Sequence, residues 1–265
     1  MTKTTNRNYK DFAVALAREA GEIMHSDFKL GMKKEWKEDN TPVTETDLII
    51  NALALKRIKK AYPSHSVIAE EGSDFRENDE FVWVCDPVDG TIPFSHGVPT
   101  TVFSIALVQN GESILGVVYD PFSDRLFIAE KGKGAFLNGT RISVSKHDTF
   151  ENAVIGINWS HRSPVDLLGL FGALKQKKSR GINVGSIIYM GALVAAGEFV
   201  AVIYPNRKVH DSASLKILVE EAGGKVTDIW GADQRYDRPT NGIVASNGVL
   251  HDQILALIRK TVEHP

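Results

Sequence analysis

Cysteine is almost absent from the sequence. The single thiol, Cys85, excludes an internal disulfide, and a chain without a disulfide framework is typical of a reducing compartment. The sequence also lacks any run of about 20 apolar residues, the length that a membrane-spanning helix needs, and its first residues lack the apolar core of a signal peptide. These absences predict a soluble cytoplasmic protein with no membrane partner.

An excess of one charge is missing as well. The 31 Lys and Arg residues nearly balance the 33 Asp and Glu residues, which leaves a net charge of −2. This balance gives no reason to expect nucleic acid or an anionic membrane surface as the main partner. What the chain does have is an ordinary apolar content of 43% over 265 residues, enough for the core of one large domain or two small ones.

Two helices are predicted near the start of the chain. Apolar residues recur at helical spacing over residues 12–28 and again over residues 47–61. In the second helix, the stripe that we expect to face inward runs from Leu48 to Ile58. Asp47 lies at or near the start of this helix.

Short strands are predicted to follow the helices. Residues 66–69 and 81–85 are apolar runs typical of buried strands. Beyond Gly97, apolar runs alternate with turn signals such as Asn110-Gly111, which is the pattern of an antiparallel meander. Its strands are expected at residues 102–108, 113–119 and 125–129.

The second half of the chain mixes both kinds of element, which favours a layered α/β or α+β fold. A boundary near residues 144–150 divides the chain into an N-terminal α+β subdomain, residues 1–146, and a C-terminal α/β subdomain, residues 147–265. The expected strands are 154–158, 199–204 and 243–246, and the expected helices are 165–174, 187–196, 211–222 and 250–262.

Carboxylates follow both of the first two predicted strands. Glu70 and Glu71 come directly after the first strand, and Asp86 and Asp89 follow the second. Such positions lie at a sheet edge, where ligand sites form in layered folds. Two like charges 4 Å apart repel by roughly 1 kcal/mol in water and about 4 kcal/mol at an effective dielectric of 20, and a bound cation relieves this repulsion. With the Val88 carbonyl between the two aspartates, these oxygens suit Mg²⁺.

The run from Asp86 to Thr91 is more specific than an ordinary turn. A lone Asp-Pro or Asp-Gly usually marks a turn. Here Pro87 fixes its own φ and Gly90 permits a tight turn, so the two acids can converge on one point. The amides of Gly90 and Thr91 and the Thr91 hydroxyl suit a phosphate oxygen or a bound water, especially at a helix start.

Four motifs resemble, in order, those of the inositol monophosphatase superfamily of lithium-sensitive, Mg²⁺-dependent phosphatases. They are residues 42–47, the pair Glu70-Glu71, residues 83–91, and residues 210–213 followed by 220–224. The resemblance spans nearly the whole chain. It implies a layered α/β/α/β/α sandwich of the sugar-phosphatase type, an active site between two merged subdomains, a homodimer, and inhibition by lithium.

The resemblance also implies the metal ligands. Two or three Mg²⁺ ions are expected, with Mn²⁺ able to substitute. Glu70, Asp86 and the Val88 carbonyl would hold the first ion, and Asp86, Asp89 and Asp211 the second, while a weaker third ion would lie at Glu70.

Catalytic and substrate-binding roles follow from the same resemblance. Asp47 and Thr91 would orient the attacking water, with Glu70 close to it. The residues implied to bind substrate are Gly90, Thr91, Asp89, Asp211 and, for specificity, Tyr204 and Arg207.

Some positions depart from the family pattern. Ile92-Pro93-Phe94 replaces a polar residue followed by Asn-Phe, and His210 replaces the usual Trp before the late Asp. His210 either contacts the substrate or a neighbouring acid, or is a packed or surface histidine. Tyr204 stands where inositol-specific members often carry a Glu that holds a sugar hydroxyl, and Arg207 suits either a second anionic group or a solvated loop. These changes leave the metal ligands intact and weaken the argument for inositol as the substrate.

The sequence therefore predicts a phosphoric monoester hydrolase that is inositol-1-monophosphatase-like and uses water activated by Mg²⁺ on a small phosphate ester. An alternative keeps the chemistry and changes the substrate to fructose 1,6-bisphosphate, histidinol phosphate or a 3′-phosphoadenosine nucleotide. A third reading, a non-catalytic regulatory protein on the same fold, is opposed by the complete set of acids.

Overall fold

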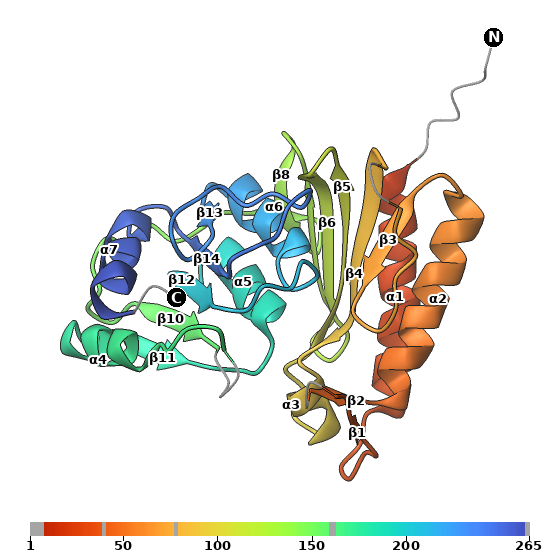
Figure 1. The fold of residues 1–265 in the computed structure, drawn as a ribbon, viewed down its shortest axis with the longest axis horizontal. Helices are drawn as coiled ribbons and strands as arrows, with labels where there is room; N and C mark the ends of the chain where they lie inside the picture. The colour runs from red at the N-terminus through yellow and green to blue at the C-terminus, as the bar shows by residue number, and fades with distance from the viewer. Residues whose placement is uncertain (1–7, 39–40, 77–78, 159–162, 263–265) are drawn as a thin grey trace.

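Helices and sheets alternate through five layers in the computed structural model, which describes residues 8–38, 41–76, 79–158 and 163–262 (Figure 1). Helices α1 and α2 cover one face of a seven-stranded sheet, α5 and α6 lie between this sheet and a five-stranded sheet, and α4 and α7 cover the outer face of the second sheet. This arrangement confirms the predicted α/β/α/β/α sandwich. The helices are α1 (Tyr9–Asp27), α2 (Glu45–Ala61), α3 (Thr91–Ser95), α4 (Leu168–Gln176), α5 (Ile187–Ala195), α6 (Ala213–Glu221) and α7 (His251–Thr261).

The seven-stranded sheet has its strands in chain order, β3-β4-β5-β6-β7-β8-β9. Only β3 and β4 are parallel; every later pair of neighbours is antiparallel, which is the predicted meander with two further strands added at its end. The strands are β3 (Ser66–Ala69), β4 (Phe81–Asp89), β5 (Val102–Gln109), β6 (Glu112–Asp120), β7 (Arg125–Glu130), β8 (Gly134–Leu137) and β9 (Thr140–Ile142).

The five-stranded sheet has the order β11-β10-β12-β14-β13. Its β10 is parallel to both neighbours, whereas β14 is antiparallel to β12 and β13. A two-stranded antiparallel ribbon of β1 and β2 lies beside the start of α2. The strands are β1 (Glu35–Trp36), β2 (Pro42–Val43), β10 (Val154–Ile157), β11 (Arg180–Ile182), β12 (Ala201–Tyr204), β13 (Lys225–Thr227) and β14 (Ile243–Ser246).

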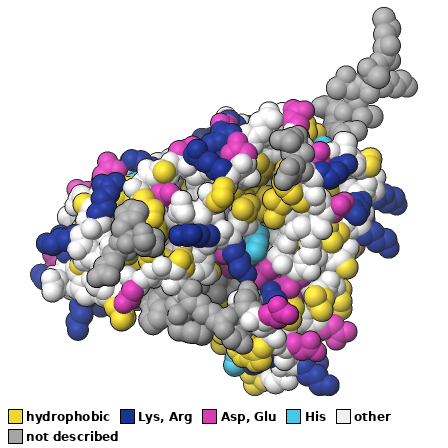
Figure 2. Space-filling view, viewed as in Figure 1, with side chains coloured by type: hydrophobic (Ala, Val, Ile, Leu, Met, Phe, Trp, Pro, Cys, Tyr) yellow, Lys and Arg dark blue, Asp and Glu magenta, His cyan; other side chains and the backbone are white. Residues whose placement is uncertain are grey.

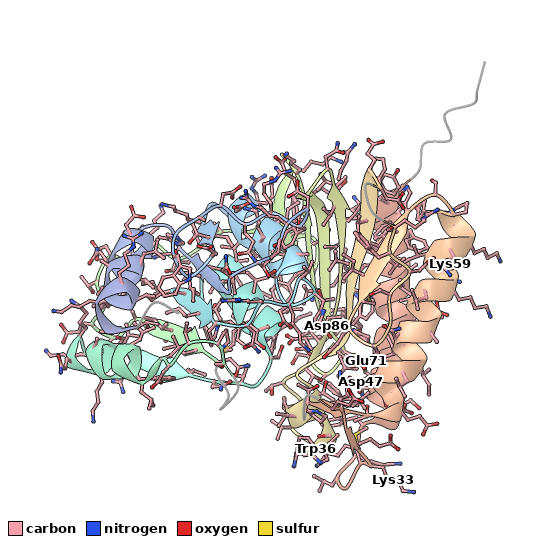
Figure 3. All side chains as sticks on the ribbon, in the orientation of Figure 1. Lys33, Trp36, Asp47, Lys59, Glu71 and Asp86 are labelled. Carbon is pink, nitrogen blue, oxygen red and sulfur yellow. The ribbon has the colours of Figure 1, made fainter. Side chains whose placement is uncertain are left out.

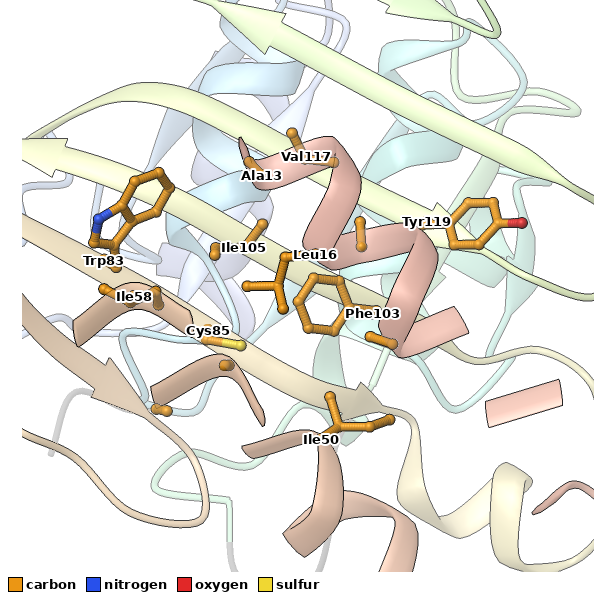
Figure 4. Packing of buried hydrophobic residues seen from close by; sticks show 14 of the residues in the cluster. Ala13, Leu16, Ile50, Ile58, Trp83, Cys85, Phe103, Ile105, Val117 and Tyr119 are labelled. Carbon is orange, nitrogen blue, oxygen red and sulfur yellow. The ribbon is translucent and has the colours of Figure 1, made fainter. Parts of the chain in front are cut away.

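The core under α1 and α2 is apolar and rich in aromatic residues (Figure 4). Leu16 of α1 packs with Trp83 of β4 and Phe103 of β5, and all three side chains are fully buried. Each such side chain stabilises the fold by roughly 1.5–3 kcal/mol through burial. Cys85 is a buried free thiol within this core, as a packing residue should be. The core therefore holds β4 rigidly, and β4 carries the acids discussed below.

The buried face of α2 differs from the predicted one. Leu48 is 51% exposed, whereas Ile50, Ala54 and Ile58 are fully buried. The helix begins at Glu45 and its first turn directs Asp47 inward, so Ile50, Ala54 and Ile58 follow Asp47 on the buried face at successive spacings of three, four and four residues. The prediction of an inward Leu48 was wrong because it followed the apolar residues alone, whereas the carboxylate of Asp47 lies on the buried face of the helix. None of the described helices is long and apolar enough to cross a membrane.

Candidate metal-binding active site

The acids of the central motif lie at the end of β4. The strand does not stop at Cys85, as predicted, but continues through Pro87 to Asp89. Its pairing with β5 shifts register between Asp86 and Asp89, which is how a residue without an N–H is accommodated inside a sheet. Gly90 then adopts a left-handed conformation (φ 93°) and turns the chain into α3. The strand therefore delivers two carboxylates and the Val88 carbonyl to one edge.

Glu70 comes to the same edge because β3 runs parallel to β4. Ala69 lies opposite Cys85 in the register, so the residues that follow, Glu70 and Asp86, are neighbours. One ligand atom each from Glu70, Asp86 and His210 lies within 4.8 Å of the other two. Figure 3 shows Asp86 close to Glu71 and Asp47, where β4, the loop after β3 and the start of α2 meet.

A second group of ligand atoms shares Asp86. Oxygens of Asp86, Asp89 and Asp211 also lie within 4.8 Å of one another, and all three residues are buried. Asp211 arrives from the second half of the chain, in the segment between β12 and α6. Its Oδ2 is buried without a hydrogen-bond partner among the described residues. An orphaned, buried carboxylate oxygen in a group of acids is what a hard divalent cation would satisfy.

Asp89 is fixed by the start of α5. Its carboxylate accepts hydrogen bonds from the amides of Ile187 (3.3 Å) and Ile188 (2.7 Å) and from the Ser186 hydroxyl. Ser186 is the N-cap of α5 and also accepts from the Tyr189 amide at 3.1 Å. The first backbone amides of α5 thus donate to Asp89, which lies 98 positions before Ile187 in the chain. The helix dipole favours the negative charge of Asp89 at this end.

Asp47 links the start of α2 to Thr91. Its Oδ2 accepts from the Thr44 amide at 2.9 Å and from the Thr44 hydroxyl, as part of a capping box. Its Oδ1 accepts from the Thr91 hydroxyl at 3.1 Å, and this hydroxyl also lies 3.2 Å from the Val88 carbonyl. The capping box at the start of α2 therefore fixes the orientation of the Asp47 carboxylate, and this carboxylate in turn positions the Thr91 hydroxyl.

Burial makes these acids bind protons more tightly than usual. It raises the pKa of Asp47 and that of Asp89 to about 6, although hydrogen bonds to both carboxylates oppose the change. Burial also raises the pKa of Asp86 and that of Asp211 well above the ordinary value, and the neighbouring carboxylates add to the shift. The same burial lowers the pKa of His210 to about 4. Without cations, several charged carboxylates in this space are costly.

Two lysines flank the acids. Lys37 Nζ lies 3.1 Å from Glu70 Oε1 and 2.5 Å from Glu71 Oε1, and Lys208 Nζ lies 3.9 Å from Glu70 Oε1. Figure 2 shows histidine, acidic and basic side chains gathered near the middle of this face, between the two halves of the molecule. The site therefore contains cations of its own at the rim, while the carboxylates of Asp86, Asp89 and Asp211 remain unneutralised by side-chain cations among the described residues.

A cavity of about 170 Å³ opens over the acids. Of the predicted site residues it brings together Glu70, Asp86, Val88, Asp89, Gly90, Thr91, Tyr204 and Asp211. Asp47 lies behind the lining, fully buried, and reaches the cavity through Thr91. Arg207 is exposed and is not one of the described residues that line the cavity, so its substrate contact stays a prediction.

Several residues of the cavity were not predicted. Asn158, Gly185, Ile187 and Asn206 also line it. Ser186, which donates to Asp89 and is not one of the lining residues, could have been found as a Ser that precedes an apolar helical run, which is a typical N-cap signal. The others carry no signal of their own in a single sequence, because they reach the cavity only through the pairing of β12 with β10 and the packing of α5.

Comparisons with known proteins agree with this geometry. A family model described as the inositol monophosphatase family matches residues 5–263. The chain is 35% identical over 255 residues to a fructose-1,6-bisphosphatase/inositol-1-monophosphatase of Thermotoga maritima, covering 96% of both chains. It is 33% identical over 249 residues to inositol monophosphatase 1 of Bos taurus, covering 89% of this chain and 88% of the relative. The solved structure of the extragenic suppressor protein suhB from Bartonella henselae matches with a TM-score of 0.87 at 29% identity, over 94% of this chain and 98% of that one.

Proposed function

Because the chain belongs to the inositol monophosphatase family, we propose that it is a Mg²⁺-dependent hydrolase of a small phosphate monoester. The observation that carries the proposal is the pair of overlapping ligand groups, in which Asp86 is shared between Glu70 and His210 on one side and Asp89 and Asp211 on the other. Two cations bound close together are the usual device for stabilising both ends of an in-line phosphoryl displacement.

Glu70, Asp86 and the Val88 carbonyl would hold one ion, and Asp86, Asp89 and Asp211 a second, with a weaker third ion at Glu70. The oxygen-only protein ligands of the second set and the unpartnered Asp211 Oδ2 support Mg²⁺ there. When bound, the Mg²⁺ ions would supply Lewis-acid chemistry, lowering the pKa of water and neutralising phosphate oxygens.

Thr91 and Asp47 would orient the attacking water. Because the Thr91 hydroxyl donates its hydrogen to Asp47 Oδ1 or to the Val88 carbonyl, its oxygen is left to accept a hydrogen bond from water. Glu70 lies at the same edge of the site, next to Asp86, and would accept a second hydrogen bond from that water. The amides of Gly90 and Thr91 at the start of α3 would bind the phosphate oxygens.

The alcohol part of the substrate would lie against Tyr204, Asn206, Asn158 and Ile187, which line the cavity beyond the acids. This lining offers neutral hydrogen-bonding groups and one apolar side chain, which suits a small polyol phosphate such as an inositol phosphate. Tyr204 is itself oriented by a hydrogen bond that its hydroxyl accepts from Asn206 at 2.7 Å.

A doubly phosphorylated substrate is the second candidate. Lys208 lies beside Glu70 with its side chain 38% exposed, so a second anionic group can approach its ammonium group from solvent, and Arg207 follows Asn206 on the same segment. Fructose 1,6-bisphosphate and a 3′-phosphoadenosine nucleotide have this second anion, whereas histidinol phosphate does not.

The test is release of inorganic phosphate from inositol 1-phosphate, fructose 1,6-bisphosphate, histidinol phosphate and a 3′-phosphoadenosine nucleotide, each with Mg²⁺ and each with a chelator. We expect Mg²⁺-dependent release, with one ester hydrolysed at least about tenfold faster than the others in kcat/KM. A Lys208→Met variant separates the two candidates, because it should slow only a doubly anionic substrate. No release from any ester by the Mg²⁺-loaded protein would instead favour a non-catalytic regulatory role.

We also propose, from the family, that the chain forms a homodimer and that it divides near residue 146 into two merged subdomains. The layer of α5 and α6 packs against both sheets, which supports merged rather than separable subdomains. Sedimentation equilibrium would measure the oligomeric state, and a monomer at micromolar concentration would contradict the homodimer.

A further inference from the structure

His210 occupies an unusual position in the first ligand group. One of its ring nitrogens lies within 4.8 Å of a carboxylate oxygen of Glu70 and of Asp86, which is close enough for a single ion to contact all three. The residue directly precedes Asp211, so the segment before α6 contributes to both groups, one with a nitrogen and one with an oxygen.

The His210 ring has no other evident task among the described residues. Its side chain is only 11% exposed, and the nearest acidic oxygen, Asp211 Oδ1, lies 3.8 Å from Nε2, which is beyond hydrogen-bond distance. Asp211 Oδ2 is buried without a hydrogen-bond partner among the described residues. Two adjacent residues therefore bring a ring nitrogen and a buried, unpaired carboxylate oxygen to the two ligand groups of the described residues.

Glu70 can serve an ion even though two lysines flank it. Lys37 and Lys208 both contact its Oε1. Its second carboxylate oxygen is left for another cation, and the side chain is 14% exposed, so it is accessible from the cavity. A carboxylate that bridges an ammonium group and a metal ion is chemically ordinary, because each oxygen carries two lone pairs.

We propose that His210 is a direct ligand of the ion held by Glu70 and Asp86, and that this nitrogen shifts the ion preference of the site from Mg²⁺ toward first-row transition ions, for which Mn²⁺ is the probe. Mg²⁺ is a hard ion that prefers six oxygen ligands. An imidazole nitrogen suits the transition ions, whose affinities for nitrogen-containing sites exceed that of Mg²⁺. The inference rests on the metal centre of the proposed function and does not depend on its substrate.

Pulsed EPR of the full-length protein loaded with Mn²⁺ tests the contact directly. We expect ¹⁴N modulation from a coordinated imidazole in the wild type and its loss in His210→Phe. His96→Phe is the matched control, because His96 is exposed and its ring contacts Lys34 (3.0 Å) and the Ile92 carbonyl (2.8 Å) instead. Absence of ¹⁴N modulation in the wild type, or its persistence in His210→Phe, would overturn the proposal.

Calorimetric titration measures the preference. The ratio of the Mg²⁺ Kd to the Mn²⁺ Kd should fall at least about tenfold in His210→Phe, as for loss of one ligand-shell residue, and should be unchanged in His96→Phe. If His210→Phe does not fold, His210→Trp replaces it, since Trp is the residue that the family usually carries there. An unchanged ratio in a folded His210 variant would also overturn the proposal.

Neither measurement uses a phosphate ester. A protein that shows the ¹⁴N signal but hydrolyses none of the four esters would keep the metal ligand and lose the proposed function. A protein that hydrolyses an ester with Mg²⁺ but shows no ¹⁴N signal would keep the proposed function and lose the His210 ligand.

Discussion

Asp211 is the side chain in which stability and function are most clearly opposed. The residue is 8% exposed, its carboxylate lies in a group with those of Asp86 and Asp89, and one of its oxygens has no partner among the described residues. Burial, with Asp89 and Glu70 adding to it, raises the pKa of Asp211 well above the ordinary value. A group whose pKa is higher in the folded than in the unfolded state binds protons more tightly when folded, so ionising it above its unfolded pKa destabilises the fold.

The first prediction is therefore that Asp211→Asn acts in two opposite directions. At pH 7.5 in a chelator, the variant should melt at a higher temperature than the wild type, because a buried charge has been removed. Its phosphate release with Mg²⁺ should fall by at least about 100-fold, because a ligand of the second ion is lost. Differential scanning fluorimetry and a phosphate assay measure the two effects. A lower melting temperature would show that the carboxylate stabilises the metal-free fold after all.

A second prediction concerns the pair Asp47 and Thr91. Burial raises the pKa of Asp47 to about 6, so the carboxylate gains a proton as the pH falls through about 6 and then loses acceptor capacity for the Thr91 hydroxyl. We expect kcat/KM to rise between about pH 5 and 7 for this reason. Thr91→Val should lower kcat by about 100-fold or more, within the range for loss of proton-transfer assistance, while Thr91→Ser should keep most of it. Equal rates in Thr91→Val and Thr91→Ser would leave the hydroxyl without a role.

Among the helices, α5 determines much of the geometry of the site, because contacts fix both its first turn and its middle. Asp89 binds its first amides, and Gly191 in its middle lets Leu215 of α6 approach closely. A Cβ at Gly191 would lie 2.3 Å from the Leu215 side chain. By contrast, Gly172 in α4 is exposed and has nothing within 4 Å of an added Cβ.

These two helical glycines give a third prediction and its control. Gly191→Ala should lower the free energy of unfolding by about 1–3 kcal/mol, because the buried α5–α6 contact must open. Gly172→Ala should raise it by up to about 1 kcal/mol, since alanine restricts the unfolded chain and favours the helix. Urea denaturation measures both. A Gly191→Ala variant at least as stable as the wild type would contradict a close α5–α6 crossing.

The same elements show what the sequence could and could not predict. Residues 66–69 and 243–246 were predicted with the observed bounds, because short apolar runs between turn signals leave little freedom. The continuation of β4 through Pro87 was missed, since proline normally ends a strand and only the register shift against β5 accommodates it. Glu70 meets Asp86 because of one parallel strand pair, and Asp89 meets Ser186 although the two residues are 97 positions apart. The grouping of Glu70 and Asp211 with the other acids was therefore predicted from the family resemblance, and the contact of Asp89 with Ser186 was not predicted.

For the whole molecule, the acids come from both halves of the chain. Asp86 and Asp89 belong to β4 of the seven-stranded sheet and Glu70 directly follows its β3, whereas Asp211 belongs to the segment between β12 and α6. A cation bound to both sets would join the two sheets and their shared helical layer. Binding of an ion to the native state alone then stabilises the entire fold by mass action.

The fourth prediction is a Mg²⁺-dependent melting temperature. At a free concentration 100 times Kd, Mg²⁺ should stabilise the protein by about 2.7 kcal/mol, which for a chain of this size corresponds to roughly 5–10 °C. Asp89→Asn should lose both this shift and turnover while remaining folded, because the amide oxygen still accepts from the start of α5. A wild-type melting temperature unchanged by millimolar Mg²⁺ would count against a preformed site, and normal turnover in Asp89→Asn would contradict its assignment as a ligand.

The hydrogen bonds from α5 to Asp89 also bear on how descendants of this protein would diverge. A lineage released from the need for hydrolysis would still be selected for an acceptor at position 89, because the first turn of a buried helix depends on it. At position 211 the opposite holds, because replacing this buried carboxylate, which has one oxygen without a partner among the described residues, would stabilise the metal-free fold. Among relatives that have lost enzymatic activity, the Asp at position 211 should therefore be substituted first and the Asp at position 89 last.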